Sequence, residues 1–369
     1  MKLRHIFTFI CLSAVLLLVT SCIDEELPSD DTPRGNFEAL WQLMDERYCF
    51  FDYKQQELGV DWNEVYSRYG SRITSKMDRY QLFEVLTGML SELKDGHVNL
   101  GASYNYGRNW SFWEEYPENY YDSIARSYLG IDYYIASVLK YKILDDNVGY
   151  VRVETFEQGI GDGNVSEMLL KLMPCKGLII DVRNNGGGQL TAAHTLASHF
   201  TNERKLVGYT MHKTGKGHND FSTPEPQYID PSDGMRWQKP VVVITNRQCF
   251  SATNDFVNCM NNMPDVTLLG DRTGGGSGMP FTQELPNGWS VRYSAVVTLD
   301  SDHQHIEFGI EPDIKVAFSP SDIQRRKDTL IEAARKLFQA GDDRSVMQSE
   351  TDVLPVSSCN GMQRVNNVP

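Results

Sequence analysis

Apolar positions recur at helical spacing between residues 36 and 100. Three stretches in this part of the chain place aromatic or aliphatic side chains three to four residues apart, which predicts amphipathic helices with one buried face. Asn36, Asp61 and Asp78 stand just before these stretches, and Asn and Asp are favoured helix N-caps. We therefore expect a helical domain over residues 36–100, with Gly96 ending its last helix before a strand begins.

From about residue 146 the pattern changes to alternating strands and helices. Two continuous apolar runs, at residues 177–182 and 241–244, predict strands that are buried on both faces. The alternation predicts an α/β core of βαβ units over residues 146–320, followed by a C-terminal helix over residues 321–341. The other expected elements are strands at 148–153, 266–269, 281–285 and 289–297, and helices at 165–173, 189–200 and 252–262.

Two segments show no clear helical or strand periodicity in their hydrophobic residues. Residues 101–145 are rich in aromatic side chains, and we expect an irregular connection there. Residues 342–369 are expected to form a disordered tail.

The N-terminus has the pattern of an export signal. Basic residues precede an apolar run over residues 6–19, and small residues follow, which predicts a secretory signal over residues 1–21. The next residue, Cys22, resembles the lipid-carrying cysteine of a bacterial lipobox, and the acidic cluster after it resembles the surface-export signal of Bacteroidetes lipoproteins. We expect residues 22–35 to be an acidic tether and the protein to be an exported lipoprotein of the outer membrane, exposed at the cell surface.

Composition and charge narrow the classes of protein. The 369 residues are 41% hydrophobic and 23% charged, which is ordinary for a globular protein and excludes a largely disordered chain. The net charge of −14 gives no basic surface for nucleic acid, so no nucleic-acid partner is expected. The seven cysteines form no CxxC pair or His/Cys cluster, so neither a metal centre nor a disulfide framework is predicted. Contact with a membrane is expected only through the N-terminal lipid.

Two strand ends carry residues suited to catalysis. Gly186, Gly187 and Gly188 follow a buried strand and open a helix, so their amides are available to an anion or an oxyanion. No nucleotide-binding glycine motif is present. Ser251 follows the next buried strand at a helix start, which suits a nucleophile, although a capping serine is the alternative. Cys249 is a competing nucleophile, and buried packing is the favoured interpretation for it.

Five motifs in register resemble those of the C-terminal processing peptidases, also called tail-specific proteases, and of the related tricorn protease core. Their order and approximate spacing agree across about residues 37–320. The five motifs are Leu93–His97, Asp181–Gly188, Asn246–Ala252, Gly270–Gly276 and Gly309–Asp313.

The resemblance implies a crotonase/ClpP-like α/β core that hydrolyses peptide bonds of a polypeptide substrate without metal or cofactor. Ser251 matches the nucleophile of the family. The Ala252 N–H and an amide of Gly186, Gly187 or Gly188 match the oxyanion hole, which stabilises the negative oxygen of the tetrahedral intermediate.

The sequence departs from the family at the general base. The bacterial processing peptidases use a loop lysine, and Gly276 stands at that position. The tricorn-like branch instead uses a histidine of the helical segment and a glutamate that orients this histidine. His97 matches the histidine, and Glu307 falls close to the position of the glutamate. Histidine suits this role because its reference pKa is about 6.5. Gly96 stands where that branch has a hydroxyl residue, and His305 is the reserve base.

Further departures concern the substrate. Cys249 and Phe250 replace a hydroxyl residue and an alanine of the serine motif, which changes the pocket wall. Only about 50 residues follow His97 before the first strand of the core, too few for the PDZ domain of about 80–100 residues that the processing peptidases carry there. We expect the aromatic stretch 104–121 to line a substrate groove instead.

Two other functions stay open at this point. The missing lysine and Gly96 are compatible with a catalytically inactive binding protein on the same fold. Crotonase-like acyl-transfer or hydratase enzymes resemble this core and also use glycine amides as an oxyanion hole, but they need no nucleophilic serine. The sequence does not indicate an oligomeric state.

Overall fold

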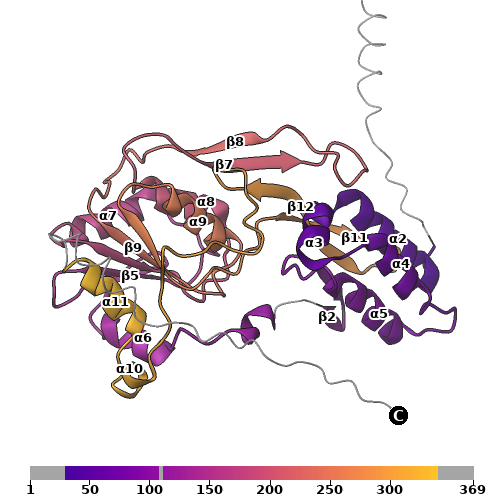
Figure 1. Ribbon diagram of the computed structural model, residues 1–369, viewed down its shortest axis with the longest axis horizontal. Coiled ribbons are helices and arrows are strands. Elements are labelled where there is room, and N and C mark those ends of the chain that lie inside the picture. Colours follow the sequence, from indigo (N-terminus) through magenta and orange to yellow (C-terminus); the bar gives the residue numbers. More distant parts are fainter. Residues whose placement is uncertain (1–29, 108–110, 340–369) are drawn as a thin grey trace, which may run out of the picture. The chain divides into compact units, whose positions relative to one another are not determined.

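The computed structural model describes residues 30–107 and 111–339 and divides into two compact units (Figure 1). The first unit contains the chain up to residue 112 together with residues 209–225 and 278–298, and the second contains the rest. The expected signal over residues 1–21, Cys22 and the expected tail over residues 342–369 lie outside the described residues. Within the described ranges, no helix combines the length and apolar character needed to cross a bilayer.

Within residues 30–107 the first unit has four helices, whereas three were predicted. They are α2 (Pro33–Arg47), α3 (Phe51–Leu58), α4 (Trp62–Gly70) and α5 (Arg79–Ser91). Asp61 and Asp78 cap α4 and α5, as predicted, because each side chain accepts hydrogen bonds from two N–H groups of the first turn.

The predicted start of the first helix is wrong. Thr32, rather than Asn36, is its N-cap, because the Thr32 hydroxyl accepts from the Gly35 N–H and Pro33 occupies the first helical position. Asn36 lies inside the first turn, where its amide donates to the Thr32 carbonyl. The expected tether over residues 22–35 therefore ends before Pro33.

The first unit also holds an antiparallel sheet. Strand β12 (Ser290–Leu299) pairs with both β1 (Asn99–Ala102) and β11 (Met279–Glu284), and β2 (Asn105–Gly107) pairs with β1. The sheet order β2-β1-β12-β7-β8 includes two unpredicted strands, β7 (Lys205–His212) and β8 (Glu225–Ile229), of which only residues 209–225 belong to the first unit. Because ladder hydrogen bonds join β12 to β1, residues 278–298 belong to this unit, although the sequence places them within the core of residues 146–320.

The second unit confirms the predicted α/β fold. Its seven-stranded sheet has the order β13-β10-β9-β6-β5-β4-β3, and the strands from β13 to β5 are parallel. The strands are β3 (Tyr134–Ala136), β4 (Leu139–Ile143), β5 (Gly149–Val153), β6 (Leu178–Asp181), β9 (Val241–Thr245), β10 (Val266–Gly270) and β13 (Ile314–Lys315).

Both faces of this sheet are covered, as the continuous apolar strands predict. Alternate residues of β5, β6 and β9 pack on one face against α7 (Asp162–Leu172), α8 (Leu190–Ser198) and α9 (Ala252–Asn261) (Figure 1). The other residues of these strands pack against α11 (Thr329–Leu337) and the end of α6 (Asp122–Leu129). The carboxyl ends of β6 and β9 are neighbours, so the turns that follow them meet.

Two predictions for the flanking segments are wrong. The segment 101–145 is not irregular, since it contains the ends of β1, β2, the 3₁₀ helix η1 (Ser111–Glu115), α6 and the hairpin β3–β4. These elements are short and partly exposed, which leaves little periodic signal in the sequence. The single helix expected over residues 321–341 is two helices, α10 (Pro320–Gln324) and α11, because Arg326 has φ +54° and Asp328 starts a new helix as its N-cap.

Candidate active site

The turn between β9 and α9 holds Ser251 in an unusual backbone conformation. Its φ of 58° and ψ of −124° lie outside the regions that a side chain normally allows. A sharp, strained strand-to-helix turn of this kind presents a nucleophilic serine in other hydrolases. Ser251 precedes the first residue of α9, yet its side chain makes no capping hydrogen bond, so the alternative of a capping serine is wrong.

Hydrogen bonds from two other loops hold this strained turn. The Ser251 N–H donates to the Gly275 carbonyl at 2.9 Å, and the Phe250 N–H donates to the Asn185 carbonyl at 3.1 Å. The Gly274 N–H donates to the Cys249 carbonyl at 2.8 Å. Strain of this kind persists only where the surrounding structure determines it from several sides, which these three bonds provide.

The glycine turn after β6 lies directly against Ser251. Gly187 has φ +102°, and a Cβ added there would lie 2.9 Å from both the Ala252 nitrogen and the Ser251 Cβ, and 2.6 Å from the Phe250 carbonyl oxygen. Only glycine fits so close a backbone approach. The structure thus brings together the two turns that the sequence analysis singled out.

The amides of this turn differ in their partners. The Ala252 N–H is the first of α9, where a helix supplies no acceptor of its own. The Gly187 N–H donates to the Asn185 Oδ1 at 3.0 Å within its own turn. Gly186 and Gly188 are exposed, whereas Gly187 is buried. The oxyanion hole predicted from Ala252 and one glycine amide stays a prediction.

The loop position where relatives have a lysine is closed by Phe250. Gly276 has φ +78°, and a Cβ added there would lie 2.4 Å from the Phe250 ring. The two departures from the family pattern are therefore linked, because the ring at position 250 occupies the space that a side chain at position 276 would need. A serine–lysine dyad cannot form from this loop without a rearrangement.

Glu307 lies beside the same loop. Its side chain is 3% exposed and accepts from the Ser277 N–H at 2.9 Å and from the Ser277 hydroxyl at 3.3 Å. The Glu307 main-chain carbonyl accepts from the Gly276 N–H at 3.0 Å. Since Gly275 binds Ser251, one short loop links the predicted nucleophile to the predicted orienting carboxylate.

His97 belongs to the first unit and is 2% exposed. Asp95 fixes the main chain here, because its Oδ1 accepts from the His97 N–H at 2.7 Å while its Oδ2 accepts from Tyr48 and Ser294 hydroxyls. Burial lowers the pKa of His97 to about 4, although the Asp95 charge opposes the shift. The imidazole is therefore neutral at neutral pH. Ser251 lies in the second unit, so its pairing with His97 stays a prediction.

Cys249 is packed in the core, as predicted. It is fully buried, and its thiol donates to the Val182 carbonyl at 3.1 Å. Burial raises the pKa of this thiol to about 12, so the thiolate that a nucleophile requires is not populated.

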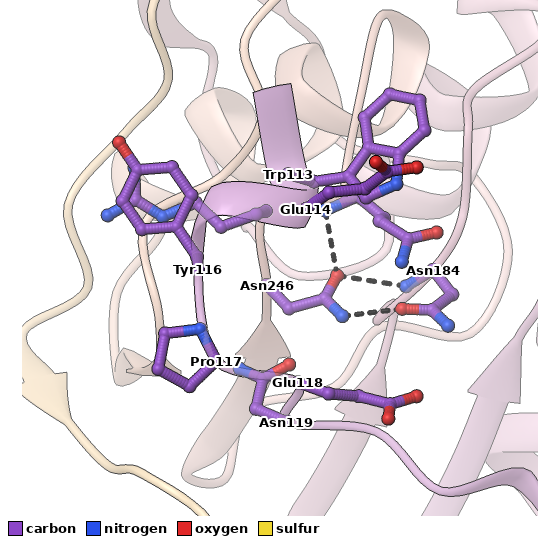
Figure 2. Close-up of a pocket in the computed structure, with 10 residues that line it drawn as sticks. Trp113, Glu114, Tyr116, Pro117, Glu118, Asn119, Asn184 and Asn246 are labelled. Atoms are coloured by element: carbon purple, nitrogen blue, oxygen red, sulfur yellow. Dashed lines mark hydrogen bonds between the residues drawn. The ribbon is translucent and has the colours of Figure 1, made fainter. Parts of the chain in front are cut away.

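A pocket of about 310 Å³ lies beyond the turns that follow β6 and β9 (Figure 2). Asn184 and Asn246 form its floor, where the Asn184 N–H donates to the Asn246 Oδ1 at 2.9 Å and the Asn246 Nδ2 donates back to the Asn184 Oδ1. Arg247 lies 3.8 Å from the centre of the Tyr116 ring. The remaining lining residues are Trp113, Glu114, Pro117, Glu118, Asn119 and Gln248. Part of the aromatic stretch 104–121 thus lines a pocket, and its role as a substrate groove stays a prediction.

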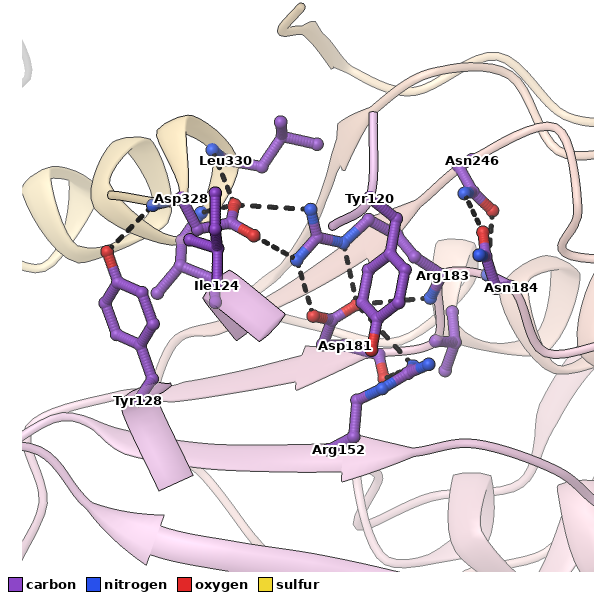
Figure 3. A network of polar contacts seen from close by, with 12 residues as sticks. Tyr120, Ile124, Tyr128, Arg152, Asp181, Arg183, Asn184, Asn246, Asp328 and Leu330 are labelled. Carbon is purple, nitrogen blue, oxygen red and sulfur yellow. Dashed lines mark hydrogen bonds and ion pairs between the residues drawn. The ribbon is translucent and has the colours of Figure 1, made fainter. Parts of the chain in front are cut away.

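The charged residues of the glycine motif form a buried ion-pair network at the end of β6 (Figure 3). The fully buried Arg183 guanidinium bridges the Asp181 carboxylate at 2.7 Å and the Asp328 carboxylate at 3.0 Å. Asp328 is also the N-cap of α11, so this network joins the end of β6 to the C-terminal helix. The sequence analysis missed Asp328, although an Asp before the apolar stripe of α11 is an N-cap signal.

Comparisons with known proteins agree with this architecture. Residues 147–316 match the peptidase family S41, and residues 29–91 match the tricorn protease C1 domain. Carboxy-terminal processing protease CtpA of Bacillus subtilis is 24% identical over 173 residues, which are 46% of this chain and 35% of that protein. The chain thus spans about a third of the length of this relative.

Solved structures extend the likeness to most of the chain. A candidate peptidase from Parabacteroides merdae is 52% identical, with a TM-score of 0.81 over 86% of this chain and 100% of that one. Mature CPAF shares the fold at 14% identity, with a TM-score of 0.65 over 84% of this chain and 98% of that one. With these matches added to the motifs in register, the chain belongs to peptidase family S41, the family of the C-terminal processing peptidases.

Proposed function

We propose that this protein is a serine endopeptidase of the tail-specific protease kind, with Ser251 as its nucleophile. The observation that carries the proposal is the turn at Ser251, whose strained backbone lies against Gly187 and the Ala252 N–H. A hydroxyl at a helix start, beside the first N–H of that helix and a glycine turn, is suited to acyl transfer. Membership of family S41 supports the same reaction class.

The proposed reaction follows the serine hydrolase scheme. The Ser251 Oγ attacks the peptide carbonyl while His97 accepts its proton, and His97 then protonates the leaving amine. The Ala252 N–H and an amide of the glycine turn stabilise the oxyanion. Water, deprotonated by His97, releases the acyl group. Glu307 orients the imidazole in this scheme, and its buried carboxylate beside the Ser251 loop supports that role.

We propose that the pocket lined by Tyr116 and Arg247 contacts the polypeptide substrate. It opens at the carboxyl ends of β6 and β9, the edge of the sheet that carries Ser251. Ligands of open α/β sheets bind outside the carboxyl ends of the strands. Arg247→Ala, which removes a side chain that lines the pocket and pairs with Asp271, should raise KM more than it lowers kcat.

The test of the proposed reaction uses a denatured protein mixture as substrate and maps the new termini. Wild type should generate them, whereas Ser251→Ala and His97→Ala should not, and the variants Lys213→Ala and Lys216→Ala should retain cleavage. A fluorophosphonate should label Ser251 in the folded protein. No labelling would favour the inactive binding protein, and activity that survives Ser251→Ala would favour a crotonase-like acyl enzyme.

We propose in addition that the protein is exported and anchored in the outer membrane by a lipid on Cys22. The lipobox-like sequence and the acidic residues that follow it support this placement. Metabolic labelling with a palmitate analogue should mark wild type and leave Cys22→Ala unmarked. Recovery of unprocessed wild type in the cytoplasmic fraction would contradict the proposal.

A further inference from the structure

Three side chains of different chemistry converge between α8 and α9. His194 Nε2 lies 2.6 Å from Asp255 Oδ2, and the Cys259 Sγ lies 3.9 Å from the same oxygen. All three potential ligand atoms lie within 4.8 Å of one another. Asp255 and Cys259 are four residues apart on α9, so they share a face, and His194 reaches them from α8.

These three groups match the coordination chemistry of Zn²⁺. Imidazole nitrogen, carboxylate oxygen and thiolate sulfur are its three protein ligand types, bound at about 2.0–2.3 Å. Ligand atoms of a tetrahedral zinc site therefore lie about 3–4 Å apart, and the observed separations bracket that range. Small rotations of His194 away from Asp255 would complete the fit.

The cluster is also accessible on one side. The His194 side chain is 41% exposed and that of Asp255 is 20% exposed, while Cys259 lies fully buried beneath them. An ion can thus enter past the imidazole and keep a water ligand toward solvent. A site with three protein ligands and one open position is an ordinary arrangement for Zn²⁺.

We propose that His194, Asp255 and Cys259 form a zinc-binding site that ties α9 to α8, one helical turn from Ser251. Binding forms Zn–N, Zn–O and Zn–S bonds, and the Cys259 thiol proton leaves to solvent. This site is independent of the peptidase reaction, and its detection needs no activity.

The test is a titration of the chelator-treated full chain with Co²⁺ and then Zn²⁺. Wild type should bind one equivalent of Co²⁺ and show a sulfur-to-metal charge-transfer band in the near ultraviolet. Zn²⁺ should then displace the Co²⁺ and abolish the band. Cys259→Ser should lose the band, and His194→Ala should weaken binding at least about 100-fold, since even indirect partners of a metal cost 10–100-fold. The matched controls His212→Ala and Cys175→Ser should bind as wild type does.

A thermal measurement keeps the proposal falsifiable if the buried Cys259→Ser variant does not fold. His194 is half-exposed, so His194→Ala should fold normally. Zn²⁺ should raise the unfolding temperature of wild type, because an ion that binds the native state stabilises that state. It should not raise the unfolding temperature of His194→Ala, which lacks one of the three coordinating side chains. Absence of stoichiometric binding by wild type, or an unchanged sulfur band in Cys259→Ser, would overturn the proposal.

Discussion

Ser251 and His97, the proposed nucleophile and base, differ in what is unusual about them. Ser251 is held by its backbone, through a strained conformation that hydrogen bonds from two neighbouring loops impose. The His97 main chain donates to the Asp95 carboxylate in a turn, and the distinctive property of His97 is burial, which keeps the ring neutral.

The two residues should therefore be sensitive to different perturbations, Ser251 to changes of the backbone and His97 to changes of pH. A substitution that changes the backbone at the strand ends should damage the serine side and leave the titration of His97 unchanged. A change of pH should act on the histidine side and leave the geometry of the turn unchanged.

The largest effect is expected when either group is removed. Ser251→Ala and His97→Ala should each lower kcat/KM by roughly 10⁴-fold or more, and the double variant should cost little beyond either single one, because such groups act as a unit. Steady-state cleavage of a fluorogenic peptide checks this, with Ser301→Ala as the matched control. Losses that multiply in the double variant would show that the two residues do not cooperate.

Gly187→Ala should have the next largest effect. Its Cβ would overlap the Phe250 carbonyl and approach the Ala252 nitrogen, at a φ that alanine rarely adopts. We expect a loss of about 1–3 kcal/mol in the free energy of unfolding and a fall in kcat of at least about 100-fold. Gly186→Ala is the matched control, because nothing lies within 4 Å of its added Cβ. Equal effects of the two variants would refute the close approach.

The pH dependence of stability should report the burial of His97. Its pKa is about 4 in the folded protein against about 6.5 when unfolded, so the unfolded chain binds the proton first as pH falls. This contribution is complete above pH 6.5 and is lost progressively down to about pH 4, by up to about 3 kcal/mol. Denaturant unfolding of wild type and His97→Gln should differ in slope across that window. Parallel curves would mean that His97 is not buried as a neutral ring.

The smallest effect concerns the loop that could have supplied a base. Gly276→Lys should lower the free energy of unfolding by about 1–2 kcal/mol, because the new side chain meets the Phe250 ring at a positive φ. It should not restore cleavage to His97→Ala. Phe250→Ala should itself lower the free energy of unfolding because it removes a buried ring, but Gly276→Lys should cost less in that background than in wild type. Restored activity in His97→Ala carrying Gly276→Lys alone would show that the ring does not exclude the lysine.

The sequence predicts best what depends on local pattern. Asp61 and Asp78 cap their helices, and the apolar runs at 177–182 and 241–244 form central strands, because capping and burial leave direct signatures. The sequence motifs identify the turns at Gly187 and Ser251 as candidate catalytic elements. That the two turns lie against each other depends on the order of the strands in the sheet, which no local motif encodes.

The missed features depend on long-range contacts. Asp328 pairs with Arg183 across 145 positions, and no local pattern marks that partnership. His194 lies 61 positions from Asp255, so the cluster with Cys259 is invisible to a search for closely spaced ligands. The pairing of β12 with β1 likewise moves residues 278–298 out of the linear domain that the sequence indicates.

The contact between Phe250 and Gly276 has an evolutionary consequence. The aromatic ring leaves no room for a side chain at position 276, so a lineage with Phe at position 250 is restricted to glycine there. A lysine arising alone at position 276 would be selected against for stability before it could contribute any chemistry. Exchange of one type of base for another within this fold therefore requires at least two coordinated mutations, and relatives with a small residue at position 250 are the ones from which it can begin.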